Sequence, residues 1–225
     1  MCGRFTHMYT WDEVHSFLSL DLLRGDVADA LFGPRYNVAP SQSVLVARAS
    51  SPAQAEFAPM RWGFVPSWAK DAKRASINAR SETVATNGVF RAAFKKRRCL
   101  IPVSGFYEWQ ALEGSTRKQP WYFHPAHDPL FAFGGLWEVW GEGADAVATV
   151  AIVTTSANEF VAPIHDRMPL IVPREHHAAW LFGEPEAAAK LMVPALGTSM
   201  AAHRVSAQVN SPRADGRELI GAVEN

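Results

Sequence analysis

The chain has 225 residues, 48% of them hydrophobic, which is enough to bury the core of one domain spanning residues 1–225. Its 22 basic and 22 acidic side chains cancel, so the whole molecule has no excess charge to attract a polyanion. The apolar stretches, such as 146–153, are too short for the roughly 20 residues that span a bilayer, and residues 1–7 lack the apolar region of a secretory signal. With Cys2 and Cys99 as the only cysteines, a disulfide scaffold is not expected, and we predict a cytoplasmic protein with reduced thiols.

The predicted elements begin with a helix over residues 11–24. Apolar side chains recur there at the spacing of one helical face, and Thr10 is placed to cap its start. Glycine and proline residues predict a loop over 33–42, whereas the β-branched content of 43–48 predicts a strand. Residues 55–68 are expected to form a second strand that runs into a loop rich in Pro and Trp.

The centre of the chain is predicted to be rich in strands. Short apolar runs separated by turn residues occur at 97–109, 121–124, 130–140 and 146–155. Helical composition returns at 173–183 and 184–192, with Gly and Pro marking a break between the two helices. This order of elements predicts an α+β fold with a curved or barrel-like sheet.

Basic residues gather in one part of this neutral chain. From Arg61 to Arg98 there are ten Lys and Arg residues but only two acidic ones, Asp71 and Glu82, a local excess of eight positive charges. Such a segment indicates an anion-facing surface, although a helix face in contact with solvent explains it equally well.

Cys2 is the first candidate catalytic residue. Its small side chain permits removal of Met1, which would leave Cys2 with a free α-amine beside its thiol. Reference pKa values of roughly 8 for the amine and roughly 8.5 for the thiol make both groups accessible nucleophiles near neutral pH. A 1,2-aminothiol of this kind forms an imine with an aldehyde and then closes through sulfur to a five-membered thiazolidine. The alternative is a small residue at a frayed terminus without any chemistry.

Residues beside Cys2 and within the basic segment suit an anionic substrate. Gly3 allows the backbone to approach a ligand closely, and Arg4 places a fixed positive charge next to the nucleophile. Asn78 can donate and accept hydrogen bonds, and Arg80 shares its face if this segment is extended. The alternative for Asn78 is that it only organises a turn.

Glu108 and His165 are candidate proton carriers. Glu108 stands between two aromatic residues at the end of an apolar run, where partial burial would raise its pKa into a useful acid–base range. An exposed carboxylate on an edge strand fits the same sequence equally well. His165 precedes an apolar run and titrates near neutral pH, whereas His176 and His177 are expected to be solvated on a surface helix.

No metal or nucleotide cofactor is expected. The two cysteines are far apart, and the sequence has neither a C-x-x-C nor an H-E-x-x-H motif. It also lacks the glycine-rich fingerprints of phosphate-binding and dinucleotide-binding loops.

Six short motifs resemble, in the same order, those of the SRAP family, the "SOS response-associated peptidase" domain: MCGRF, YNVAP, RWGFVPSW, INARSET, CLIPVSGFYEW and IHDRMPLIV. The resemblance covers about residues 2–219 and includes the late segment HRVSAQVN. It implies a single α+β domain with a barrel-like, mostly antiparallel β core flanked by helices. It also implies a DNA-repair role with no cofactor, for a nucleoid-associated monomer that contacts no membrane.

The same resemblance assigns roles to individual residues. It implies four catalytic residues: Cys2, Asn78, Glu108 and His165. It implies three arginines that contact DNA phosphates: Arg4, Arg80 and Arg167. Trp68 takes the position of an aromatic residue in the DNA channel, and its assignment and that of the residues around Phe90 depend on the alignment of the segment before INAR.

The activity that the resemblance implies is covalent capture of abasic sites in single-stranded DNA, including junctions with duplex. Cys2 would form a thiazolidine with the abasic-site aldehyde and so shield the lesion during repair or replication, while lyase or autoproteolytic, peptidase-type activity stays open. Two rival functions remain: an N-terminal-nucleophile hydrolase, in which the α-amine of Cys2 activates its own thiol, and a noncatalytic single-strand binder. The local positive charge suits phosphates better than it suits a peptide.

Overall fold

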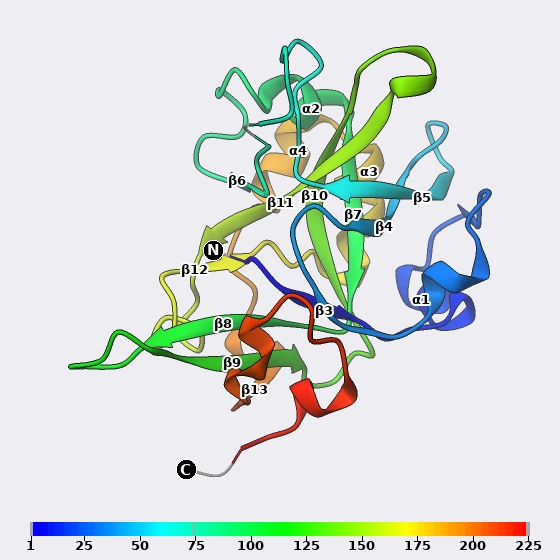
Figure 1. Ribbon diagram of the computed structural model, residues 1–225. Helices are drawn as coiled ribbons and strands as arrows, with labels where there is room; N and C mark the ends of the chain where they lie inside the picture. Colours follow the sequence, from blue (N-terminus) through cyan, green and yellow to red (C-terminus); the bar gives the residue numbers. More distant parts are fainter. Residues whose placement is uncertain (1, 74, 224–225) are drawn as a thin grey trace.

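Two β-sheets with four short α-helices make up the computed structural model, which describes residues 2–73 and 75–223 (Figure 1). The smaller sheet has five strands, in the order β13 (Met200–Arg204), β9 (Lys118–Pro125), β8 (Gly105–Ala111), β1 (Phe5–His7) and β3 (Arg35–Val38). All of its strand pairs are antiparallel. This sheet carries the N-terminal strand in its interior, so the start of the chain is anchored on both sides.

Five strands of the larger sheet close into a barrel. Around the ring they are β11 (Val147–Ser156), β10 (Phe131–Trp140), β7 (Arg98–Val103), β4 (Ser43–Ala49) and β5 (Ala55–Trp62). Successive neighbours pair in antiparallel fashion, and a parallel pairing of Val150 with Trp62 joins β11 to β5. Closure leaves no free edge within the ring. The predicted α+β fold with a barrel-like, mostly antiparallel core is therefore confirmed.

Shorter elements lie around the barrel. Three short strands extend the larger sheet: β2 (Leu22–Leu23), β6 (Asn78–Arg80) and β12 (Arg167–Pro169). The α-helices are α1 (Trp11–Leu18), α2 (Arg91–Lys96), α3 (His177–Phe182) and α4 (Pro185–Lys190). One-turn 3₁₀ helices occupy Asp29–Phe32, Gly143–Asp145, Arg174–His176, Gly197–Ser199, Ala207–Asn210 and Arg217–Ile220. The predicted break between the two late helices is confirmed, because α3 ends at Phe182 and α4 begins at Pro185.

Alternation along the barrel strands divides their apolar side chains between two clusters, and a third cluster lies beside the small sheet. In β4, Val44 and Val46 belong to one cluster and Leu45 belongs to the other, as the two faces of a strand require. The Leu45 cluster includes the apolar faces of the helices. The Val46 cluster also includes Cys2 and Phe5, so the apolar core fixes the N-terminal segment in place.

The first helix is shorter than predicted. Thr10 caps α1 as expected, and its side chain and that of Glu13 satisfy each other's backbone N–H groups. The helix ends at Leu18 because Ser19 adopts a left-handed conformation with φ of 50°. Leu22, predicted to lie on the helix, instead pairs in parallel with Ala55 of β5.

The predicted loop over residues 33–42 contains a strand, β3. Its residues pair with β1, and its side chains contact the C-terminal part of the chain. Asn37 is buried, and its amide nitrogen donates to the carbonyl oxygens of Ser211 (2.9 Å) and Ala214 (2.8 Å). The loop prediction was wrong because the strand depends on pairing of Val38 with Phe5 and on side-chain contacts with residues more than 170 positions away, none of which local sequence reveals.

Two charged or titratable residues are buried where the sequence predicted exposure. His177 is buried, with its ring nitrogens 3.1 Å from the carbonyl oxygens of Leu18 and Val172, whereas His176 is exposed as expected. Arg98, counted as part of an anion-facing surface, is also buried.

Arg98 donates hydrogen bonds to carbonyl groups at the C-terminal ends of two helices. Its guanidinium donates to the carbonyl oxygens of Phe94 (2.7 Å) and Trp180 (2.6 Å), and to that of Gly183. The last carbonyls of an α-helix have no partner within the helix, so Arg98 satisfies groups at the ends of α2 and α3.

Replacing Arg98 with Met is expected to lower the free energy of unfolding by at least about 3 kcal/mol, because hydrogen bonds to a charged donor contribute roughly 1.5–3 kcal/mol each. Urea unfolding followed by fluorescence measures this loss. The matched control is Arg91→Met, since Arg91 is exposed on α2 and its replacement should change stability by less than ~0.5 kcal/mol. Equal stabilities for the two variants would contradict the capping role of Arg98.

Candidate functional site

The structure brings together the four predicted catalytic residues from distant parts of the chain. Cys2 precedes β1, Asn78 begins β6, Glu108 lies in β8, and His165 lies in the turn between β11 and β12. In Figure 1 the blue start of the chain lies beside β12, with β6 and β8 on either side. The site therefore forms where the small sheet meets one end of the barrel.

Cys2 is buried, and hydrogen bonds fix the backbone of the segment that contains it. Its carbonyl oxygen accepts a hydrogen bond from the side-chain amide of Asn78 (3.0 Å). Two residues on, the carbonyl of Arg4 accepts from the backbone N–H of Tyr107 (3.0 Å), which continues the pairing of β1 with β8 toward the terminus. Burial raises the pKa of the Cys2 thiol well above its usual value, and the negative charge of Glu108 adds to this. The thiol is therefore protonated at neutral pH.

Asn78 is fixed by the sheet. In β6 it pairs in parallel with Ile152 of β11, and the residue before it, Ile77, accepts a hydrogen bond from the indole of Trp62 (2.9 Å). The strand also gives Asn78 and Arg80 a common face, as predicted. Within the part of the chain that the structure describes, the buried Oδ1 of Asn78 has no hydrogen-bond partner, so it can accept a hydrogen bond from a ligand.

Glu108 is buried in the interior of the small sheet. Its strand, β8, lies between β1 and β9, which rules out the alternative of an exposed carboxylate on an edge strand. Burial raises the pKa of Glu108 to about 7. A carboxyl group of this kind exchanges protons readily at neutral pH.

His165 lies next to Glu108, with Nε2 3.8 Å from Oε2 of the carboxyl group. Its own backbone N–H donates to the carbonyl of Val161 (3.0 Å), which closes the turn before β12. Nδ1 accepts from the backbone N–H of Arg167 (3.0 Å) and also lies 3.2 Å from the Arg167 carbonyl oxygen. With the N–H directed at Nδ1, the proton of the neutral ring is on Nε2, facing Glu108. Burial lowers the pKa of His165, so the ring is neutral at physiological pH.

The three predicted phosphate-binding arginines differ in what they already contact. Arg4 donates to the side-chain oxygen of Asn37 (2.8 Å) and to the carbonyl of Val209 (2.7 Å), and burial lowers its pKa. Arg167 forms a two-pronged ion pair with Glu82. Arg80 is exposed and makes no hydrogen bond or ion pair through its side chain within residues 2–73 and 75–223. Its guanidinium is therefore the most available of the three to a phosphate.

Trp68 is the most prominent aromatic residue near the basic segment, with 69% of its surface exposed. It borders a pocket of about 570 Å³ that Val65 and Val89 also line. The indole of Trp140 donates to the carbonyl of Ala69 (2.8 Å) and so holds the loop that carries Trp68. Phe90, in contrast, is buried against Phe64 with ring centroids 5.2 Å apart.

The basic segment is largely exposed. Its exposed members are Arg61, Lys70, Lys73, Arg80, Arg91, Lys95 and Lys96. Arg97 forms an ion pair with Glu138 (2.6 Å), and Arg74 lies outside the described residues. Within the described ranges there is no group of three or more His, Cys, Asp or Glu residues that could hold a metal ion. The same part of the chain has no helix long and apolar enough to cross a membrane.

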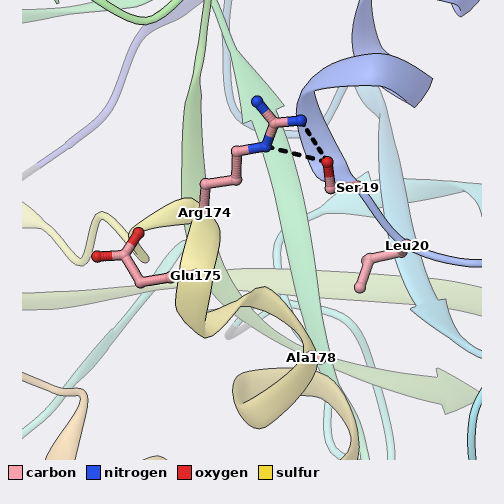
Figure 2. Close-up of a pocket in the computed structure, with 5 residues that line it drawn as sticks. All are labelled: Ser19, Leu20, Arg174, Glu175 and Ala178. Carbon is pink, nitrogen blue, oxygen red and sulfur yellow. Dashed lines mark hydrogen bonds between the residues drawn. The ribbon is translucent and has the colours of Figure 1, made fainter.

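A separate hollow of about 450 Å³ lies beside the end of α1 (Figure 2). Arg174 crosses it to donate to the hydroxyl of Ser19 (3.0 Å) and so ties the 3₁₀ helix Arg174–His176 to α1. None of the predicted site residues lines this hollow, and its contacts are structural.

Sequence reasoning missed two residues that contact the site. Asn37 holds Arg4, and Glu82 holds Arg167. The only signal for Glu82 was its negative charge inside a strongly basic segment, and nothing in the sequence indicated its partner.

Comparison with known proteins shows the family of this chain. The family model described as SOS response associated peptidase (SRAP) matches residues 1–212. The chain belongs to the SRAP family. Its relatives in this family include "Abasic site processing protein YoaM" of Bacillus subtilis (strain 168), 38% identical over 230 residues that cover 99% of this chain and 98% of the relative. "Abasic site processing protein YedK" of Escherichia coli (strain K12) is 32% identical over 99% of this chain and 100% of its own length.

The SRAP fold is also found in solved structures. A crystal structure of a protein from Bacteroides thetaiotaomicron matches with a TM-score of 0.86 over 99% of this chain and all of that one, at 21% sequence identity. The crystal structure of a phage-related protein from Bordetella bronchiseptica matches with a TM-score of 0.71 at 27% identity, covering 91% of this chain and 94% of that one. The architecture is thus shared by chains of low sequence identity.

Proposed function

We propose that this SRAP protein captures abasic sites in single-stranded DNA by forming a thiazolidine between Cys2, freed of Met1, and the C1′ aldehyde of the lesion. The observation that carries the proposal is the arrangement around Cys2: Asn78 binds its carbonyl at 3.0 Å, and Glu108 lies 3.8 Å from His165. The names of YoaM and YedK, which describe them as abasic site processing proteins, support the choice of substrate.

The first step joins the α-amine of Cys2 to the open aldehyde. The nitrogen attacks C1′, Glu108 accepts a proton from the amine, and loss of the carbinol oxygen as water gives an imine. The pKa of Glu108, about 7, suits this role, because the carboxylate accepts the proton and the resulting acid can return it to the leaving hydroxyl. Opening of the abasic sugar moves the proton of the C1′ hydroxyl to the ring oxygen. The neutral ring of His165 assists by donating a hydrogen bond from Nε2 to that oxygen, which favours the open aldehyde.

The second step closes the ring. The sulfur of Cys2 adds to C1′, and the thiol proton moves to the former imine nitrogen, so the five-membered ring forms with no oxidant or cofactor. Because burial keeps the thiol protonated, the amine acts first and the sulfur follows. Asn78 holds the backbone of Cys2 so that both nucleophiles face one carbon, and such proximity can contribute ~7–11 kcal/mol in favourable cases.

DNA would reach this site along the exposed basic surface. Arg80, on the same strand face as Asn78, is the residue we expect to contact a phosphate beside the lesion, and Trp68 is the residue we expect to stack on a base. A missing base gives up little stacking, so an abasic sugar can be drawn toward Cys2 at low cost.

Arg80→Gln should weaken binding of single-stranded DNA of any sequence and reduce the slope of log affinity against log salt by about 0.7, the value for one phosphate contact on a single strand. Fluorescence anisotropy at several salt concentrations measures both quantities. Arg24→Gln is the control, because Arg24 pairs with Asp29 beside α1, away from the site. An unchanged slope in the Arg80 variant would remove Arg80 from the DNA surface.

A labelled single-stranded oligonucleotide with one abasic site tests the function itself. On a denaturing gel, thiazolidine formation gives a slowly migrating band that survives heating with detergent. A noncatalytic binder gives no such band, and an N-terminal-nucleophile hydrolase cleaves a peptide substrate without retaining DNA. Absence of the covalent band with protein whose N-terminus is shown to be Cys2 would overturn the proposal.

A further inference from the structure

Glu82 and Arg167 join two strands beside the site. The guanidinium of Arg167 donates to both carboxylate oxygens of Glu82, and Nη2 also donates to the carbonyl of Thr154 (2.7 Å). Glu82 follows β6, Arg167 begins β12, and Thr154 lies in β11, which pairs with both strands. The hydrogen bonds from Arg167 lower the pKa of Glu82 to about 2, so the ion pair is intact throughout the neutral range.

The backbone of Arg167 links this ion pair to His165. Its N–H group donates to Nδ1 of His165 at 3.0 Å, while Oδ1 of Asp166 lies 3.0 Å from the same nitrogen. The carbonyl oxygen of Arg167 also lies 3.2 Å from Nδ1. Nδ1 can accept from the Arg167 N–H, or it can carry a proton and donate to Asp166 or to the Arg167 carbonyl, but a neutral ring cannot do both. The first arrangement leaves the ring proton on Nε2 toward Glu108, whereas the second removes it.

Two features favour the arrangement with Arg167. The carboxylate of Asp166 is exposed, so solvent weakens its attraction for a proton on Nδ1. The side chain of Arg167, in contrast, is largely buried and tied to both Glu82 and Thr154, which restrains the position of its backbone.

We infer that Glu82 is a positioning residue: by fixing the side chain of Arg167, it keeps the Arg167 backbone N–H on Nδ1 of His165 and the ring proton on Nε2. The effect of Glu82 on DNA chemistry rests on the proposed function, whereas its effect on the histidine ring does not. A second consequence concerns DNA binding. Because Glu82 neutralises the positive charge of Arg167, Arg80 contributes more to phosphate binding than Arg167 does.

The inference is tested with Glu82→Ala and Glu82→Gln. Nitrogen-15 NMR of the His165 ring reports which nitrogen carries the proton. Single-turnover assays report the rate of crosslinking to an abasic oligonucleotide. Fluorescence anisotropy reports the affinity for an intact oligonucleotide. In Glu82→Ala we expect the ring proton to shift toward Nδ1. Crosslinking should be slower by about 10- to 100-fold, the usual effect when a catalytic group is displaced slightly from its reacting partner. DNA affinity should not fall. Glu82→Gln should be intermediate, because its amide oxygen can still accept from Arg167.

Glu56→Gln is the matched control, since Glu56 forms a comparable ion pair with Arg48 (3.0 and 2.8 Å) on the barrel and should alter none of the three readouts. Unchanged ring-nitrogen signals in both Glu82 variants would overturn the inference, as would slower crosslinking that follows only from weaker DNA binding. If Glu82→Ala does not fold, the Glu82→Gln variant is compared with wild-type protein, provided that the two have the same thermal stability, and its ring-nitrogen signals test the inference. If the wild-type protein forms no crosslink, the proposed function fails, and the ring-nitrogen comparison still tests the role of Glu82.

Discussion

Protein that retains Met1, or that carries an uncleaved N-terminal extension, is expected to form no stable adduct with an abasic oligonucleotide. In such protein the thiol of Cys2 is intact, but its nitrogen belongs to a peptide bond and cannot form an imine. The thiazolidine requires both nucleophiles on one residue. Intact-protein mass spectrometry after incubation with the oligonucleotide measures the adduct, with processed protein compared directly with the extended form.

Two variants of Cys2 separate the amine from the thiol, and a third variant serves as the control. Cys2→Ala should bind DNA and yield no thiazolidine, although its free amine can still form a reversible imine. Cys2→Ser should give a weaker or more readily reversed adduct. Cys99→Ala is the control, because Cys99 is a buried core thiol whose pKa burial raises, and its loss should leave the adduct unchanged. A stable adduct in the extended protein, formed at the wild-type rate, would mean that Cys2 acts through sulfur alone or not at all.

Removing the proton carriers should slow crosslinking without abolishing DNA binding. Glu108→Gln and His165→Ala are each expected to reduce the single-turnover rate by ~10²- to 10⁴-fold, the usual range for general acid–base groups. The rate should also depend on pH. Because Glu108 acts as a base and its pKa is about 7, the wild-type rate should rise as pH increases through 7 and the carboxyl group loses its proton.

Glu108→Gln should remove that rise and leave only the titration of the α-amine, whose reference pKa is roughly 8. His176→Ala is the control for His165, since His176 is exposed on a 3₁₀ helix and should be silent. Wild-type rates of crosslinking and of crosslink reversal in His165→Ala would make that residue purely structural. A rate that falls as pH rises through 7 would assign Glu108 as an acid in the slow step.

The candidate site residues could be singled out in the sequence because their chemistry is local. A cysteine at position 2, an asparagine two positions before an arginine, and a glutamate in an apolar run are each visible in a few consecutive residues. The aromatic residues on either side of Glu108 made its burial one of two equal alternatives, and the sequence left open whether β8 was a central or an edge strand. The structure answers this question, since β1 and β9 flank β8.

Which arginines are free could not be predicted, because charge in a sequence does not reveal its partner. Arg4, Arg80 and Arg167 were equivalent in the sequence, yet Arg4 binds Asn37 and Val209, and Arg167 binds Glu82. The same limit applied to Arg98, which satisfies helix carbonyls in the core.

The sequence by itself determined the class of fold, the strand-rich centre and the two late helices, since each depends on local composition and spacing. Its resemblance to the SRAP family selected the candidate reactive residues. Only the tertiary structure decided where the first helix ends, that residues 35–38 form a strand, and that His177 is buried. It alone placed Glu108 3.8 Å from His165, a residue far along the sequence, and showed that Glu82 holds Arg167. The physical reason is that these contacts form only when the barrel closes and the N-terminal strand pairs within the small sheet. Both steps depend on pairing between strands that are distant in the sequence, which local propensity does not encode.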